Sequence, residues 1–174
     1  DVNDRSDIVQ SGAQEVDVVL PYAQLIAGND TAVAQVLTAV RAACPGLLLK
    51  VILETGELKD AALMAHASRL ALDAGADFLK TSTGKTPVSA TPEAARTLLE
   101  TIAADPAARQ RVGFKPSGGI RTVAEAAIYM ALTAEILGPQ ALTPKRFRLG
   151  ASSILADIEA ILGGQMPPAQ APAG

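Results

Sequence analysis

Charged side chains interrupt apolar segments at four places along the chain. Asp17 lies in EVDVVL, Lys50 in LLLKVIL and Lys80 in DFLKT, and Lys115 ends RVGFK. Each segment reads as a strand of a parallel sheet, where a charge is costly to bury without a partner. A strand end that reaches solvent would explain any one of these residues. Because the carboxyl ends of parallel strands meet at one edge, four such residues in successive strands instead predict a shared site.

The types of these residues suit imine chemistry. An amine attacks a carbonyl only in its neutral form, and a neighbouring ammonium group lowers the pKa of that amine. A carboxylate nearby can transfer protons during the reaction. Asp17, Lys80 and Lys115 therefore supply a nucleophile, a charge that perturbs it and a proton carrier. Charge alone does not decide which lysine is the nucleophile.

Three loops that follow expected strands suit a phosphate group. Their sequences are TSTGK at 81–85, PSGGIR at 116–121 and GASS at 150–153, the last directly before an expected helix. Glycine lets backbone N–H groups approach an anion, and a helix N-terminus attracts one. Each loop alone also fits an ordinary turn. Their common position beside strand-end lysines favours a phosphate site, which barrels often place after their last two strands.

Strands and helices must alternate to bring these loops together. We expect strands at Glu15–Leu20, Leu47–Leu53, Asp77–Thr81, Arg111–Lys115 and Arg146–Gly150. We expect helices at Asp30–Ala43, Leu58–Ala74 and Ser153–Leu162, and further helices that begin at the N-cap Thr91 and at the capping box Thr122–Glu125. Nearly continuous apolar strands, each followed by a helix, predict an α/β fold with a parallel sheet. Periodicity leaves open a doubly wound sheet or part of an eight-stranded barrel.

The composition fits one globular domain and excludes several classes of partner. The chain has 174 residues, a hydrophobic fraction of 49% and a net charge of −3. The acidic balance argues against a nucleic acid or a polybasic contact with a membrane. Cys44 is the only cysteine, so an internal disulfide is excluded, which suits the reducing cytoplasm. We expect the domain to occupy residues 1–163 and residues 164–174 to form a disordered tail, because the tail lacks apolar periodicity.

The segments and loops together resemble the deoxyribose-phosphate aldolase family. The motifs EVDVVLPY, LLLKVILETGEL, GADFLKTSTGK, GFKPSGGIRT and RLGASSIL match it in order and spacing, from about Gly12 to Leu155. The resemblance implies a TIM (β/α)8-barrel fold and a class I aldolase of the cytoplasm. Such an enzyme reversibly cleaves 2-deoxy-D-ribose 5-phosphate to D-glyceraldehyde 3-phosphate and acetaldehyde through a lysine Schiff base, in deoxyribonucleoside catabolism.

The resemblance also implies roles for individual residues. Lys80 corresponds to the Schiff-base lysine, Lys115 to the lysine that perturbs its pKa, and Asp17 to the residue that assists proton transfer. Lys50 and Thr83 correspond to residues that line the pocket. The resemblance implies neither a metal nor an organic cofactor. The phosphate is expected at Gly84, Lys85, Gly118, Gly119, Arg121, Gly150, Ser152 and Ser153.

The family has about three strand–helix units before the first segment matched here. The first expected strand corresponds to the fourth of the family, and residues 1–13 read as the end of a helix that runs into it. We therefore expect only about five of the eight units, which cannot close a barrel and leave sheet edges exposed. Such a chain is expected to form a homo-oligomer, to depend on the N-terminal segment, or to be poorly stable.

Two other functions remain open. Another Schiff-base aldolase, such as a transaldolase-like enzyme, would use the same lysine chemistry, although the sequence around Lys80 argues against it. A truncated, non-catalytic module would bind sugar phosphates or assemble with a partner without forming an imine. Substrate profiling separates the first alternative, and trapping of the imine separates the second.

Overall fold

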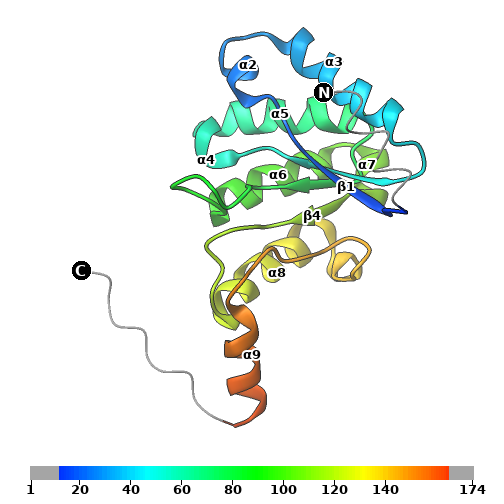
Figure 1. Cartoon of the computed structure of the whole chain (residues 1–174). Helices are drawn as coiled ribbons and strands as arrows, with labels where there is room; N and C mark the ends of the chain where they lie inside the picture. The colour runs from blue at the N-terminus through cyan, green and yellow to red at the C-terminus, as the bar shows by residue number, and fades with distance from the viewer. Residues whose placement is uncertain (1–11, 165–174) are drawn as a thin grey trace.

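The computed structural model describes residues 12–164 as a curved parallel sheet with helices along one face (Figure 1). The strands are ordered β1-β2-β3-β4, and every neighbouring pair is parallel. The expectations for residues 1–11 and for the tail from residue 165 lie outside the described residues. The strands are β1 (Glu15–Val19), β2 (Leu48–Ile52), β3 (Phe78–Lys80) and β4 (Gly113–Lys115).

The helices α3, α5, α6 and α8 pack against one another in sequence order around the outer face of the sheet. Within residues 12–164, no helix covers the inner face, whereas a doubly wound sheet carries helices on both faces. This arrangement confirms the barrel type of α/β fold. The helices are α2 (Tyr22–Ile26), α3 (Asp30–Ala43), α4 (Thr55–Leu58), α5 (Ala61–Asp73), α6 (Pro92–Ala104), α7 (Pro106–Arg111), α8 (Val123–Leu137) and α9 (Ile154–Leu162), with a 3₁₀ turn at Pro139–Ala141.

Local caps explain where most of these helices begin. Thr91 accepts a hydrogen bond from the Ala94 amide before α6, and the capping box at Thr122 is present before α8, as expected. The helix expected from Leu58 begins only at Ala61. Lys59 has a φ of 62°, which breaks the helix, and Asp60 then acts as the N-cap. In the part of the chain that the structure describes, each helix is too short or too polar to cross a lipid bilayer.

The fifth expected strand is not a regular strand. The segment 146–150 lies parallel to β4 and forms isolated bridges at Phe147 and Gly150. The amides of Arg148 and Gly150 donate to the carbonyls of Phe114 and Pro116. A continuous parallel ladder would also need a hydrogen bond from the backbone N–H of residue 116 to the segment 146–150. Proline has no N–H, so the ladder is interrupted at Pro116. The expectation of a continuous strand over Arg146–Gly150 was wrong for this reason.

The strands divide their side chains between two faces. Val16, Leu49, Val51, Leu79 and Phe114 are buried under the outer helices. Because side chains alternate along a strand, their neighbours in the sequence point to the inner face. These inner residues include all four of the charged strand residues predicted to share a site.

Asp77 fastens the opposite end of the sheet, at the amino ends of the strands. Its carboxylate accepts hydrogen bonds from the Leu49 amide at 2.9 Å, from Arg41 at 3.1 Å and from Arg111 at 2.7 Å. It thereby ties β2 and β3 to the ends of α3 and α7. Contacts at this end of a barrel contribute to stability, whereas active sites lie at the carboxyl ends of the strands.

We expect Asp77→Ala to lower the free energy of unfolding by about 2 kcal/mol, because it leaves the buried Leu49 amide without its acceptor and removes one acceptor from each of two guanidinium groups. Urea unfolding followed by circular dichroism measures this change. Asp73→Asn is the control, since Asp73 is exposed at the end of α5. Equal unfolding midpoints for the two variants would contradict the role of Asp77.

Candidate active site

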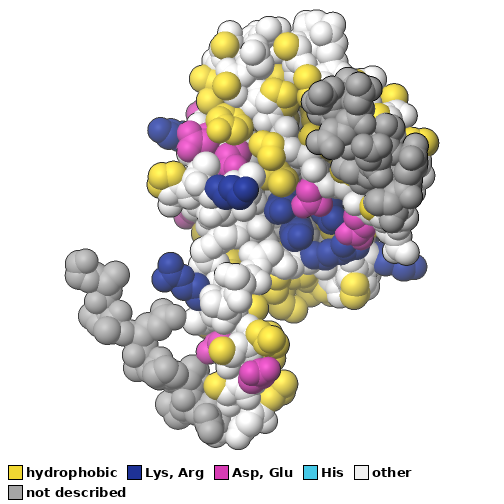
Figure 2. All heavy atoms as spheres, viewed as in Figure 1, with side chains coloured by type: hydrophobic (Ala, Val, Ile, Leu, Met, Phe, Trp, Pro, Cys, Tyr) yellow, Lys and Arg dark blue, Asp and Glu magenta, His cyan; other side chains and the backbone are white. Residues whose placement is uncertain are grey.

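The register of the sheet places the predicted catalytic residues side by side. Lys80 and Lys115 are direct Cα partners in β3 and β4, and Asp17 and Lys50 are direct partners in β1 and β2. Neighbouring strands lie about 4.8 Å apart, so side chains at partner positions on the same face come close together. Figure 2 shows basic and acidic side chains gathered at the open inner face of the sheet.

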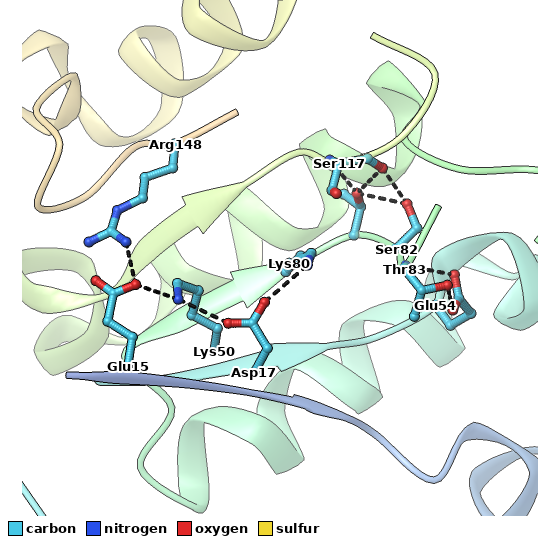
Figure 3. Close-up of polar contacts among 10 residues, drawn as sticks. Glu15, Asp17, Lys50, Glu54, Lys80, Ser82, Thr83, Ser117 and Arg148 are labelled. Atoms are coloured by element: carbon cyan, nitrogen blue, oxygen red, sulfur yellow. Dashed lines mark hydrogen bonds and ion pairs between the residues drawn. The ribbon is translucent and has the colours of Figure 1, made fainter. Parts of the chain in front are cut away.

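Asp17 joins two lysines through its two carboxylate oxygens (Figure 3). Lys50 Nζ lies 2.9 Å from Asp17 Oδ1, and Lys80 Nζ lies 3.0 Å from Asp17 Oδ2. Lys50 is only 4% exposed, so its charge depends on these partners. The structure thus brings together three of the four charged residues that the sequence singled out, and Lys115 stands next to Lys80.

Two further members of the cluster were missed by the sequence analysis. Glu15 Oε2 lies 2.6 Å from Lys50 Nζ and 2.6 Å from Arg148 Nη1. The Arg148 guanidinium also lies 4.9 Å from the centre of the Phe78 ring. Gly113 makes room for that ring, because a Cβ there would lie 2.3 Å from a ring carbon. The result is a continuous chain of ion pairs from Arg148 to Lys80.

The carboxylates of this chain are held in the ionised form. Hydrogen bonds from Arg148 and Lys50 lower the pKa of Glu15 below its usual value. Burial alone would raise the pKa of Asp17, but its hydrogen bonds to Lys50 and Lys80 outweigh burial and lower it. Both acids therefore remain negatively charged at neutral pH.

Lys115, the register partner of Lys80, has a pKa below its ordinary value. Burial lowers the pKa of Lys115, and the charge of Lys80 lowers it further. Asp17 acts in the opposite direction, but its effect on the pKa is smaller. A lysine with a lowered pKa releases its proton more readily than a free lysine does.

A polar cavity of about 460 Å³ lies beside the lysines, at the carboxyl ends of the strands. Of the residues predicted to hold a phosphate, all but Lys85 line it. The cavity is also lined by Ser117, Ile120 and Ala151, which were not among the predicted site residues. The lining residues are Thr83, Gly84, Ser117, Gly118, Gly119, Ile120, Arg121, Gly150, Ala151, Ser152 and Ser153.

The walls of this cavity are tied to one another. The Thr81 hydroxyl accepts a hydrogen bond from the Ser117 amide at 2.9 Å, and Thr81 and Ser82 both donate to the Ser117 carbonyl. Gly150 approaches Ser117 so closely that a Cβ on Gly150 would lie 2.3 Å from the Ser117 hydroxyl. The three glycine-rich loops therefore form one surface, which is lined by backbone and by the N-terminus of α9.

A larger cavity of about 610 Å³ lies on the outer face, between α5 and α6. None of the predicted site residues lines it, and the charges around it are mixed. We assign the candidate active site to the smaller cavity and the adjoining lysine cluster, because size alone does not supply reactive groups.

Comparisons with known proteins agree on one family. The profile described as "DeoC/LacD family aldolase" matches residues 1–160. A curated deoxyribose-phosphate aldolase from Agrobacterium fabrum is 49% identical over 160 residues, which are 91% of this chain and 61% of that protein.

Solved structures show the same fold. A protein from Coccidioides immitis that is assigned as a deoxyribose-phosphate aldolase superposes with a TM-score of 0.76 at 31% identity, over 91% of this chain and 57% of that one. The tetrameric deoxyribose-phosphate aldolase of Aeropyrum pernix superposes with a TM-score of 0.66 at 26% identity, over 92% of this chain and 60% of that one. The chain thus spans about three fifths of the length of these relatives.

The acidic members of the cluster predict a pH dependence of stability. Asp17 has a lower pKa in the folded chain than in the unfolded chain, so the unfolded chain binds protons first as the pH falls. The free energy of unfolding should therefore decrease as the pH falls from about 5 through the lowered pKa. In Asp17→Asn this decrease should be smaller, because one contributing carboxylate is gone. Urea unfolding at a series of pH values tests this, and parallel curves for the two proteins would refute it.

Proposed function

Because the chain belongs to the DeoC/LacD aldolase family, we propose that it acts as a deoxyribose-phosphate aldolase. The reaction is the reversible cleavage of 2-deoxy-D-ribose 5-phosphate to D-glyceraldehyde 3-phosphate and acetaldehyde. The observation that carries this proposal is the position of Lys80, whose amine lies 3.0 Å from a carboxylate and whose register partner is a second lysine. The chain covers 61% of the length of its curated relative, and the activity that we propose is that of the whole protein.

Lys80 is the nucleophile in this proposal. Its ammonium group must first lose a proton, which Asp17 at 3.0 Å or a neutral Lys115 on the neighbouring strand can accept. The amine then adds to the C1 aldehyde of the open-chain sugar. Loss of water from the adduct gives an iminium ion.

The iminium ion draws electrons from the bond that breaks. The C3 hydroxyl of the sugar loses its proton and the C2–C3 bond breaks. Glyceraldehyde 3-phosphate then leaves, and the oxygen on C3 of the sugar becomes its aldehyde oxygen. The bonding electrons move onto the iminium and leave an enamine on Lys80. Protonation of the enamine at C2 and addition of water then release acetaldehyde. Asp17 and Lys115 carry the protons, since both lie beside Lys80.

The cavity of glycine-rich loops holds the phosphate at the far end of the sugar. Backbone amides, Arg121 and the hydroxyls of Ser152 and Ser153 are suited to bind a phosphate dianion. Binding the remote phosphate fixes the distance of C1 from the reactive amine, so the affinity for phosphate also orients the reacting carbon. Lys85 lies outside the cavity, and we assign it no contact with the phosphate.

We also propose that the chain acts in the cytoplasm and works as a homo-oligomer or with the additional segment that its longer relatives have. The inner face exposes Val19 at 41%, at the end of β1, and Leu48 at 38%, at the start of β2. The tetrameric relative from Aeropyrum pernix supports assembly. A transaldolase-like activity or a non-catalytic module has no comparable support.

Trapping of the imine tests the proposal. Incubation with 2-deoxyribose 5-phosphate or acetaldehyde followed by borohydride should leave a reduced adduct on Lys80, located by peptide mass spectrometry. Lys80→Leu should abolish the adduct, and Lys115→Leu should slow its formation at least about tenfold, because a proton acceptor beside Lys80 is lost. Lys145→Leu, at an exposed position, is the control and should react normally.

The result can contradict the proposal in two ways. An adduct on Lys115 instead of Lys80 would exchange the roles of the two lysines. A folded sample that forms no adduct with either substrate would exclude Schiff-base chemistry in this chain.

A further inference from the structure

One buried carboxylate takes no part in the chemistry above. Glu54 is 2% exposed and follows β2 at the carboxyl edge of the sheet. Within residues 12–164, it forms no ion pair with a lysine, an arginine or a histidine. A buried charge without a counter-ion is costly unless hydrogen bonds satisfy its oxygens. The donors to Glu54 are therefore the key to its role.

In the described part of the chain, every group that donates a hydrogen bond to the Glu54 carboxylate comes from the loop after β3. Thr83 donates its amide to Oε1 at 3.2 Å and its hydroxyl to Oε2 at 2.6 Å. The hydroxyl of Thr86 lies 3.2 Å from Oε1 and is shared with the Val88 carbonyl. Figure 3 shows Glu54 facing Thr83 across the gap between the two strand ends. A single carboxylate thus holds the loop at two places.

The contact with Thr83 also fixes the next turn of the loop. The Thr83 hydroxyl donates to Glu54 and accepts a hydrogen bond from the Lys85 amide at 3.1 Å. Its only proton is engaged, so its orientation is set by the carboxylate. Gly84 lies between these two anchored residues, and Thr83 and Gly84 form one wall of the phosphate cavity.

The backbone of Glu54 is strained in a way that serves this contact. Its φ of 55° lies in the left-handed region, which is unfavourable for a residue with a long side chain. The amides of Leu53 and Thr55 bond to the consecutive carbonyls of Lys80 and Thr81. In a regular parallel ladder these acceptors would be two residues apart, so Glu54 is an inserted residue, equivalent to a bulge. Bulges of this kind turn a side chain in a new direction beside active sites.

We propose that Glu54 is a positioning residue that sets the conformation of the loop 83–86 and through it the affinity of the cavity for the phosphate of the substrate. The inference rests on the proposed function, because it takes this loop as a wall of the phosphate site. Glu54 touches neither the lysine cluster nor the reacting carbons. Its loss should therefore weaken binding of the phosphorylated end and leave the chemistry at Lys80 intact.

The test compares Glu54→Gln with wild type on 2-deoxyribose 5-phosphate and on unphosphorylated 2-deoxyribose. Glutamine keeps the size of glutamate, but its side-chain N–H groups would then lie opposite one of the two donors of Thr83. We expect kcat/KM for the phosphorylated sugar to fall about tenfold, mainly through KM, as for the loss of one hydrogen bond to a charged group. The value for deoxyribose should change less than about twofold, within the range of ordinary surface substitutions.

Glu57→Gln is the matched control, since Glu57 lies three residues further on in α4 and is only half-buried. Thr83→Val and Thr83→Ser form a second pair that does not alter the strained backbone of Glu54. Valine should reproduce the selective loss and serine should restore wild-type KM, because serine retains the hydroxyl. The double variant Glu54→Gln with Thr83→Val should lose no more than either single variant.

Inorganic phosphate separates this inference from the proposed reaction. Calorimetric titration should show phosphate binding that weakens about tenfold in Glu54→Gln, even if wild type cleaves neither sugar, and that outcome would overturn the function but support the positioning role. Cleavage by wild type with an unchanged ratio of kcat/KM for the two sugars in both Glu54→Gln and Thr83→Val would overturn the positioning role. Should Glu54→Gln not fold, Thr86→Val takes its place, because the Thr86 hydroxyl also bonds to Glu54 and Thr86 does not line the cavity; an unchanged ratio in that variant would then overturn the positioning role.

Discussion

The burial of positive charge on the inner face of the sheet is the constraint on which the site depends. Arg148, Glu15, Lys50, Asp17 and Lys80 alternate in sign along a continuous chain of contacts. Each anion lies between two cations, so the chain itself carries one more positive than negative charge. Lys115 adds another beside its end. Burial lowers the pKa of Lys115, and the positive charge of Lys80 lowers it further.

The parallel sheet is what makes this chain of charges possible. Asp17 and Lys50 occupy one register layer. Lys80 and Lys115 occupy the adjacent layer, two residues closer to the carboxyl ends, where Lys80 pairs with Ile52. Side chains in the same layer of the inner face are neighbours, while the residues between them anchor the outer helices. The hydrophobic core and the reactive cluster are therefore two faces of the same strands. Substitutions in one cannot be interpreted without reference to the other.

Much of this arrangement could be predicted from the sequence, because a charge within an apolar strand is a strong local signal. Asp17, Lys50, Lys80 and the glycine-rich loops were found in this way. Glu15 was missed because a charge at the first residue of a strand is common. Arg148 stands in the middle of the fifth expected strand but was not singled out, and only the fold shows that the two side chains meet across 133 positions of sequence. The place of Arg148 and Glu15 in the cluster could therefore be recognised only from the tertiary structure.

The remaining differences are also non-local. The fifth strand was expected from its own residues, yet it is interrupted by a proline in the strand beside it. Lys85 follows the expected glycine, but the turn fixed by Thr83 leaves it outside the cavity. The left-handed conformation of Glu54 has no signature in its residue type, because glycine or asparagine would be expected there. Sequence patterns predict which elements form, whereas contacts between elements decide how these details resolve.

The interrupted ladder at Pro116 means that two walls of the cavity are held by different kinds of contact. The wall at Thr83 is held by a buried carboxylate, and the wall at Gly150 belongs to a segment whose backbone pairing has a gap. Two hydrogen bonds still flank the gap, from the Gly150 amide to the Pro116 carbonyl and from the Gly118 amide to the Gly150 carbonyl. Substitution of one side chain, Glu54, therefore acts on the wall at Thr83, whereas a change at the Gly150 wall must act through the backbone.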